Sequence, residues 1–173
     1  MTTFPQRGFV RLINVERFEV YGIGVNYPKD WSVDIKRLKR EDGEVVFRSV
    51  EGPYLTVLWG PLDKLLKKHD SLDSYVEYMI QGLMKSRRVK KFEVLSREVA
   101  EINGHRACIT HMRLLVRYGG VFLKTYLGQD VWTMHLFCEP TRRFIVVYDV
   151  GGLGYEAENE ERFRKSLEGF KCH

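Results

Sequence analysis

The sequence is poor in cysteine, in amide side chains and in long apolar runs. Cysteine occurs only at Cys108, Cys138 and Cys172, an odd and widely spaced set that excludes a disulfide framework. No segment approaches the roughly 18–20 consecutive apolar residues that cross a bilayer, and the first residues carry no apolar stretch typical of a secretion signal. We therefore expect a cytoplasmic protein with no membrane partner.

Asparagine and glutamine are scarce, whereas charged residues make up 29% of the chain. Few amides with many charges is a composition found in thermophile proteins, so we expect a thermophile source and a melting temperature above the mesophile range. The net charge of +5 permits an anionic partner without requiring one.

The length and composition predict one globular domain over residues 1–173, with residues 1–10 as a loose lead-in. A chain of 173 residues that is 44% hydrophobic can bury a sizeable core. There is no internal repeat, low-complexity segment or linker that would divide it.

The strongest single pattern predicts a central helix over residues 72–86. Apolar residues recur there at helical spacing and form one stripe. Asp70 or Ser71 can cap its start. Gly82 is expected on the packed side, where the backbone would approach a sheet. The stripe consists of Leu72, Tyr75, Val76, Met79, Ile80 and Leu83.

After this helix the sequence predicts a meander of strands. Asn103-Gly104 is typical of a tight hairpin turn and sets Val99 opposite Cys108 and Leu95 opposite Met112. A second turn at Gly119-Gly120 sets three more pairs on the same face: Met112 with Leu127, Leu114 with Thr125, and Val116 with Leu123.

The loop over residues 128–130 is ambiguous, because a loop of three residues would reverse which face of the sheet each later side chain points to. With the turn in place, Trp132, Met134, Leu136, Cys138, Ile145 and Val147 join the inner face with Cys108 and Met112. A last helix is expected over residues 156–168, since Phe163 and Leu167 form a stripe and acids precede bases. The order predicts an α+β domain with a mainly antiparallel sheet and helices packed on it.

Three short motifs resemble the PsbP-like family, which includes a photosystem II subunit, a eukaryotic Ran-release factor and bacterial lipoproteins. The resemblance spans roughly residues 20–170 and implies an α/β/α sandwich that acts by protein contact, generally without a catalytic centre. It carries over no functional residue. The motifs are Tyr27-Pro-Lys-Asp-Trp31-Ser-Val33, Leu72-Asp-Ser-Tyr75, and Phe92-Glu-Val-Leu-Ser96 running to Ile102-Asn-Gly104.

The outer face of the meander is the candidate binding surface, because it mixes arginine with aromatic residues as binding hot spots do. The alternative to a binding surface is that the last helix covers part of this face, which then forms a second core layer. Phe137, Phe144, Val146 and Tyr148 are expected on the same face, and His111 and His135 could neighbour each other or a carboxylate. The candidate residues are His111, Arg113, Arg117, Phe122, Lys124, Tyr126 and His135.

Cys108, His111, His135 and Cys138 have the residue types of a metal quartet. In a strand, residues three apart point to opposite faces, so each Cys and its neighbouring His cannot reach one ion without a bulge. Gly151-Gly-Leu-Gly154 lacks the Lys-Ser/Thr of a phosphate loop. We expect no metal, no cofactor and no catalytic residue.

These observations predict a non-enzymatic protein-binding or adaptor domain. Its partner is an unknown protein or a second copy paired through an exposed edge strand. The alternative is a small apolar or anionic ligand in a helix–sheet groove. Nucleic acid is disfavoured because acids interrupt the basic runs and no RNA-binding motif accompanies them, and an enzyme with an unrecognised site is the remaining alternative.

Overall fold

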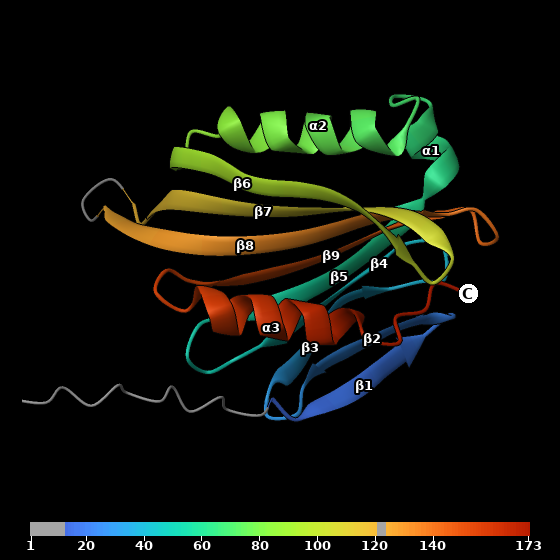
Figure 1. Cartoon of the computed structure of the whole chain (residues 1–173), viewed down its shortest axis with the longest axis horizontal. Helices are drawn as coiled ribbons and strands as arrows, with labels where there is room; N and C mark the ends of the chain where they lie inside the picture. Colours follow the sequence, from blue (N-terminus) through green and yellow to red (C-terminus); the bar gives the residue numbers. More distant parts are fainter. Residues whose placement is uncertain (1–12, 121–123) are drawn as a thin grey trace, which may run out of the picture.

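The computed structural model describes residues 13–120 and 124–173, which form two sheets and three helices (Figure 1). The chain is an α+β domain with a mostly antiparallel sheet, as predicted. The small sheet pairs β1 (Val15–Val20) with β2 (Ile23–Pro28). The predicted lead-in, residues 1–10, and residues 121–123, which include Leu123 of the predicted pair with Val116, lie outside the described residues.

The large sheet has seven strands, each antiparallel to its neighbours. In order across the sheet they are β3 (Ser32–Leu38), β4 (Gly43–Arg48), β5 (Tyr54–Pro61), β9 (Arg143–Gly152), β8 (Thr125–Cys138), β7 (His105–Tyr118) and β6 (Val89–Ile102). The helices are α1 (Leu62–Leu66), α2 (Leu72–Met84) and α3 (Glu156–Leu167).

The large sheet is covered on both faces, so the layers form an α/β/α sandwich. Helix α2 lies on one face, and α3 lies with the small sheet on the other (Figure 1). One core lies on the α3 side and includes Phe47, Trp59 and Phe163. A second lies beneath α2. The part of the chain that the structure describes contains no helix with the length and hydropathy needed to span a bilayer.

Helix α2 forms where the apolar spacing predicted it. The Ser71 hydroxyl accepts a hydrogen bond from the Ser74 backbone amide at 3.1 Å, which caps the first turn. Leu72, Val76 and Ile80 are buried against the sheet. The expectation for Gly82 was wrong: this residue is exposed, and a Cβ there would meet nothing within 4 Å. Gly82 is two residues from Ile80 and therefore about 200° around the helix, on the solvent side.

The first hairpin of the meander forms at Asn103-Gly104, and Val99 pairs with Cys108 as predicted. Positive φ angles at both turn residues fit a tight hairpin turn. The pairing of Leu95 with Met112 was wrong, because the register shifts at Leu95 and Val94 takes its place opposite Met112.

The second hairpin has a longer loop than predicted, so its register differs by four residues. Val116 pairs with Leu127 and Tyr118 with Thr125. The predicted pairs of Met112 with Leu127 and Leu114 with Thr125 were therefore wrong. A register shift by an even number of residues leaves each side chain on the same face of the sheet. This error alone therefore did not change the predicted face of any side chain.

The prediction of a turn at residues 128–130 was the larger error. Strand β8 runs unbroken from Thr125 to Cys138. Val131 consequently shares the α2 face with Met112. The residues placed with Met112 on the inner face lie instead on the α3 side: Trp132, Met134, Leu136, Cys138, Ile145 and Val147. Conversely, Phe137, Phe144, Val146 and Tyr148 pack on the α2 side and not beside Arg113.

Candidate functional site

The structure brings together several of the predicted binding residues at one end of the sheet. Arg113 and Arg117 lie on β7 and Tyr126 on β8, all on the α3-side face, and Arg117 is the direct cross-strand partner of Tyr126. Lys124 is exposed and immediately precedes β8 at this end. Phe122, also predicted, lies outside the described residues.

His111 shares this face but lies further in, beneath α3. Its ring stacks on Trp132 with centroids 4.0 Å apart, and its Nε2 lies 2.6 Å from the Asp130 carboxylate. Of the two neighbours that the sequence left open, the structure therefore shows the carboxylate. His111 is mostly covered, and its contacts join β7 to β8.

His135 lies on the opposite face, so the prediction that it shares a surface with His111 was wrong. The unbroken β8 turns it toward α2, where it meets the edge of Tyr75 with ring centroids 5.6 Å apart. Burial, reinforced by the positive charge of Arg97, lowers the pKa of His135 to about 4. His135 is thus a core residue.

The same strand geometry places Cys108, His111, His135 and Cys138, the four residues considered above as metal ligands, on two opposite faces of the sheet. Cys108 and His135 are cross-strand partners on the α2 side. His111 and Cys138 lie on the α3 side. Cys108 and Cys138 are buried free cysteines, as expected for small apolar residues.

A buried polar network that the sequence analysis missed fixes α3 to the sheet. Asp130 and Asp149 are both fully buried. Asn159 donates to Asp130 at 3.1 Å and accepts from Arg162 at 3.0 Å. Arg162 in turn holds Asp149 with both its Nε and an Nη, the Nε at 2.7 Å. Burial raises the pKa of Asp149 to about 6 although Arg162 opposes the shift.

The surface that remains open at this end is strongly basic, and we call it the basic end. It is formed where α2 ends, β6 starts, β7 ends and β8 starts, at the left of Figure 1. The Arg117 backbone amide donates to the Arg88 carbonyl at 2.7 Å, which joins the two runs of cations. The basic end comprises Lys85, Arg87, Arg88, Lys90, Lys91, Arg113, Arg117 and Lys124.

Almost none of these cations is neutralised locally. Among the described residues, Arg113 alone of this set forms an ion pair, with Glu156 at 3.5 Å. Elsewhere on the surface, cations such as Arg106 and Arg142 are matched with carboxylates. Glu93 is the cross-strand partner of Arg113 and also lies at this end, but the eight cations outnumber these carboxylates and leave a local excess of positive charge.

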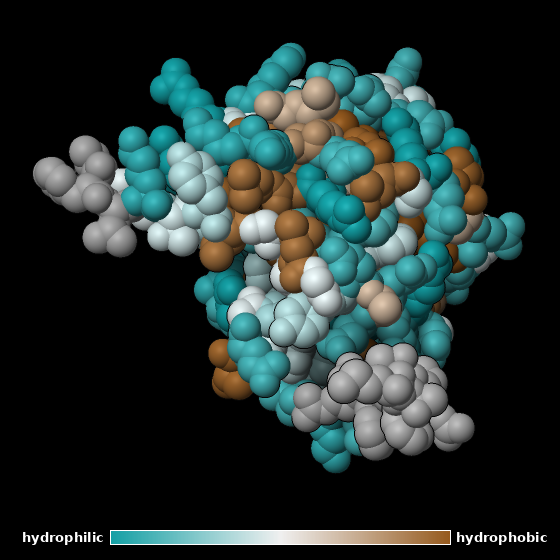
Figure 2. All heavy atoms as spheres, turned by 60° about the vertical axis from the view of Figure 1, so that its left-hand side comes forward, coloured by the Kyte–Doolittle hydropathy of each residue, from teal (hydrophilic) through white to brown (hydrophobic). Residues whose placement is uncertain are grey.

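Apolar and aromatic side chains are exposed beside these charges. Tyr126 and Leu127 are each about half exposed, and Leu153 packs over Gly128, where a Cβ would lie 2.3 Å from its Cδ1. Figure 2 shows brown side chains dispersed among teal ones across this side of the molecule. A groove of about 620 Å³ opens here, lined by Lys91, Phe92, Glu93, Arg113, Leu114, Leu115 and Leu153.

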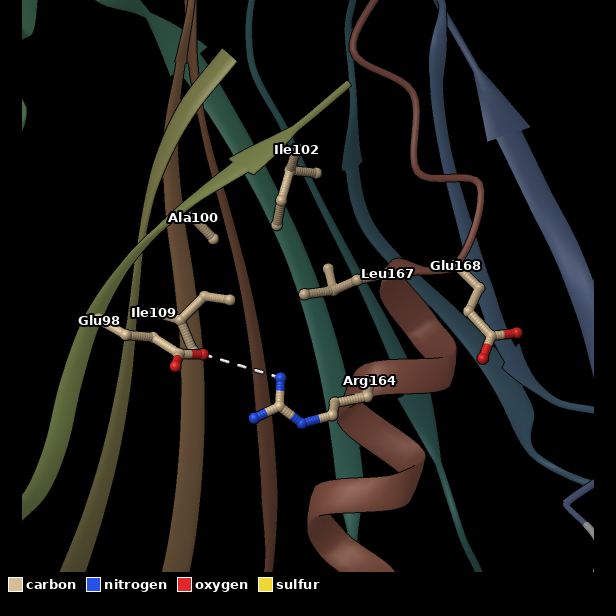
Figure 3. A pocket seen from close by; sticks show the side chains of 7 residues that line it. All are labelled: Glu98, Ala100, Ile102, Ile109, Arg164, Leu167 and Glu168. Atoms are coloured by element: carbon tan, nitrogen blue, oxygen red, sulfur yellow. Dashed lines mark ion pairs between the residues drawn. The ribbon is translucent and has the colours of Figure 1, made fainter. Parts of the chain in front are cut away.

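A second, smaller groove of about 320 Å³ lies between α3 and the strands β6 and β7. Ala100, Ile102, Ile109 and Leu167 give it apolar walls. Figure 3 shows Arg164 reaching from α3 across the groove toward Glu98, and this ion pair spans 3.7 Å. The Arg164 side chain thus bridges the two walls of the groove.

Comparison with known proteins reveals similarity in structure. No protein-family model matches the sequence, and no curated protein matches it. The solution structure of cyanobacterial PsbP (CyanoP) from Synechocystis sp. PCC 6803 matches with a TM-score of 0.65 at 16% identity, covering 98% of both chains. A protein of unknown function, PA94 from Pseudomonas aeruginosa, matches with a TM-score of 0.53 at 11% identity, covering 89% of this chain and 94% of that one.

The layers and the comparisons together define the class of fold, an antiparallel sheet sandwiched between helices. The chain has a PsbP-like fold, as its short motifs indicated. At these identities the likeness concerns the fold alone, so function must be argued from the residues of the basic end.

Proposed function

We propose that this chain is a non-enzymatic protein-binding domain that holds an acidic protein partner on its basic end. The observation that carries the proposal is a group of eight cations, of which Arg113 alone forms an ion pair among the described residues, beside exposed rings. Arginine and tyrosine are enriched at the energetic centres of protein interfaces. A surface of this composition gains most from a partner that supplies carboxylates and apolar contacts together.

Arg117 and Tyr126 are the centre of the proposed contact. They are cross-strand partners, so the guanidinium and the phenol ring project from adjacent positions of a rigid sheet. Because the strands already fix the backbone, binding has to order only the side chains here, at roughly 0.5–1.5 kcal/mol each. Lys91 and Arg113 line the adjoining groove and extend the positive charge toward α3.

The groove also supports a second candidate, a small anionic ligand. Its volume of about 620 Å³ is within the range of small-molecule sites, and it combines the cations of Lys91 and Arg113 and the carboxylate of Glu93 with the apolar side chains of Leu115 and Leu153. A protein partner is preferred because the unpaired cations extend well beyond the groove, to Arg88 and Lys124.

The experiment is native mass spectrometry of the chain captured from lysate of its own source, with and without nuclease, at low and high salt. The proposal predicts a protein complex that survives nuclease and weakens as salt screens the basic end. A complex removed by nuclease, a chain carrying only a small added mass, or a bare chain would contradict it.

A further inference from the structure

Four metal-ligand side chains from three separate segments meet at the end of the sheet opposite the basic end. His105 starts β7, Cys138 ends β8, and Cys172 and His173 follow α3. One ligand atom from each residue lies within 4.8 Å of every other. Both cysteines are buried, His105 is partly buried and His173 is exposed. Sequence spacing could not reveal this cluster, because its parts are distant in the chain.

The distances within the cluster are close to those of a tetrahedral zinc site. Bonds of about 2.3 Å to sulfur and 2.0–2.1 Å to nitrogen place tetrahedral ligand atoms roughly 3.3–3.8 Å apart. The His173 Nδ1 lies 3.2 Å from the Cys172 Sγ and 3.6 Å from the Cys138 Sγ. The remaining ligand atoms are at most 4.8 Å apart, so their separations need to shorten by no more than about 1.5 Å to reach the same spacing.

A second observation at this place concerns the side chain of His105. The Nε2 atom of His105 is buried and has no hydrogen-bond partner among the residues that the structure describes. Leaving a buried polar atom without a partner costs roughly 1–3 kcal/mol. Coordination of a metal ion through Nε2 would satisfy this atom, and His105 is one of the four ligands.

The surrounding fold holds the ligands in position. Lys171 exchanges two backbone hydrogen bonds with Gly24, each 3.0 Å long, which fixes the segment that carries Cys172 and His173. Arg143 donates to the Cys172 carbonyl at 3.1 Å, and Asn103 donates to the Cys172 Sγ at 3.5 Å. Outer contacts of this kind orient the ligands of metal sites.

We propose that His105, Cys138, Cys172 and His173 form a structural site for Zn²⁺ or a metal of similar preference. Two thiolates and two imidazoles are a ligand set that favours zinc. All four positions are taken by protein, which is typical of structural sites and leaves no place for a substrate. Binding displaces the two thiol protons and fastens the Lys171–His173 segment to the large sheet.

The test uses Co²⁺ as a spectroscopic probe and Zn²⁺ as its competitor, with reduced, metal-free protein. We expect one equivalent of Co²⁺ to give the visible bands of a tetrahedral site and a thiolate charge-transfer band, and Zn²⁺ to abolish both. His173→Ala, a change at an exposed position outside the core, should weaken binding at least about tenfold. Cys172→Ala should remove the charge-transfer band or reduce it by half.

Cys108→Ala is the matched control, because Cys108 is also a buried free cysteine but packs on the α2 side. This variant should bind Co²⁺ as the wild type does. The proposal is overturned if the wild-type protein takes up no Co²⁺, or if the His173 and Cys172 variants bind as tightly as it does. It is also overturned if Cys138 and Cys172 form a disulfide that persists in reductant.

Discussion

The imidazole of His111 lies 2.6 Å from the fully buried carboxylate of Asp130 while its ring stacks on Trp132. This pair connects β7 to β8, and Asn159 extends the connection to α3. Arg162 continues it to Asp149 on β9, so the polar groups that anchor α3 form one continuous network across four elements. Removing one member leaves the remaining buried polar groups without partners. Single changes within the network should therefore lower the free energy of unfolding strongly.

Among these changes, removal of Arg162, the cation of the buried ion pair with Asp149, should lower the free energy of unfolding most. Arg162→Met leaves the Asp149 carboxylate buried without a partner, and we expect a loss of about 3–5 kcal/mol in the free energy of unfolding near pH 8. The loss should be smaller near pH 5, because the pKa of Asp149 is already raised to about 6 and the carboxyl then carries a proton. Urea unfolding at both pH values measures this.

Arg164→Met is the control for the loss of an arginine from α3. Arg164 is exposed and paired at the surface with Glu160 and Glu98, so its removal should cost less than about 1 kcal/mol. Equal losses for the two variants would show that the Asp149 pair contributes no more than a surface contact.

His135 should make the protein sensitive to acid. Its pKa is about 4 in the folded protein against 6.5 for the free side chain. Between these values the unfolded chain binds a proton that the folded chain does not, so His135 by itself contributes a loss of about 3 kcal/mol as the pH drops from about 6.5 to about 4, whereas Asp149 contributes in the opposite direction. We expect His135→Phe to remove the His135 contribution, so that the difference in unfolding free energy between wild type and variant changes with pH, as measured by urea unfolding across the range.

His69→Gln controls for the loss of a histidine outside the core, since His69 is only partly buried. It should keep the wild-type dependence on pH. A His135→Phe variant with an unchanged slope would contradict the placement of His135 beneath α2.

Gly82 offers a stabilising substitution in the last turn of α2. A Cβ there meets nothing within 4 Å, so Gly82→Ala should raise the free energy of unfolding by about 0.5–1 kcal/mol through helix propensity. Gly104→Ala also finds open space but has a φ of +76°, and it should lower stability by about 1–2 kcal/mol. A destabilising Gly82→Ala would show that α2 lies closer to another element at this point.

Local patterns in the sequence predicted the elements whose cause is local. The stripe of α2 and the turn at Asn103-Gly104 depend on residues adjacent in the chain, and both were confirmed, except that Met79 of the stripe is exposed. The faces of β8 were misread because Gly128, Gln129 and Asp130 have the composition of a turn. In the structure Leu153 covers Gly128 and the α3 network pairs Asp130, so these residues fit within a strand.

The candidate sites were only partly predictable. Arg113, Arg117, Lys124 and Tyr126 were identified because alternation in a strand places polar and aromatic residues on one face. The extension of the basic end to Arg88 and Lys91 required knowing that α2 ends beside β7, which is a tertiary relationship. The same applies to the cluster of His105 and Cys172, whose parts meet only after folding.

The most direct test of the account measures the affinity of the captured partner for charge-reversed variants. Lys91→Glu with Arg117→Glu changes two cations of the basic end, and Lys67→Glu with Lys68→Glu makes the same charge change beside α1, at the opposite end of the molecule (Figure 1). We expect the first pair of changes to weaken binding by about ten- to hundredfold with little change in melting temperature, and the second pair to leave binding nearly as in the wild type. Equal weakening by both pairs, or none by the first, would contradict it.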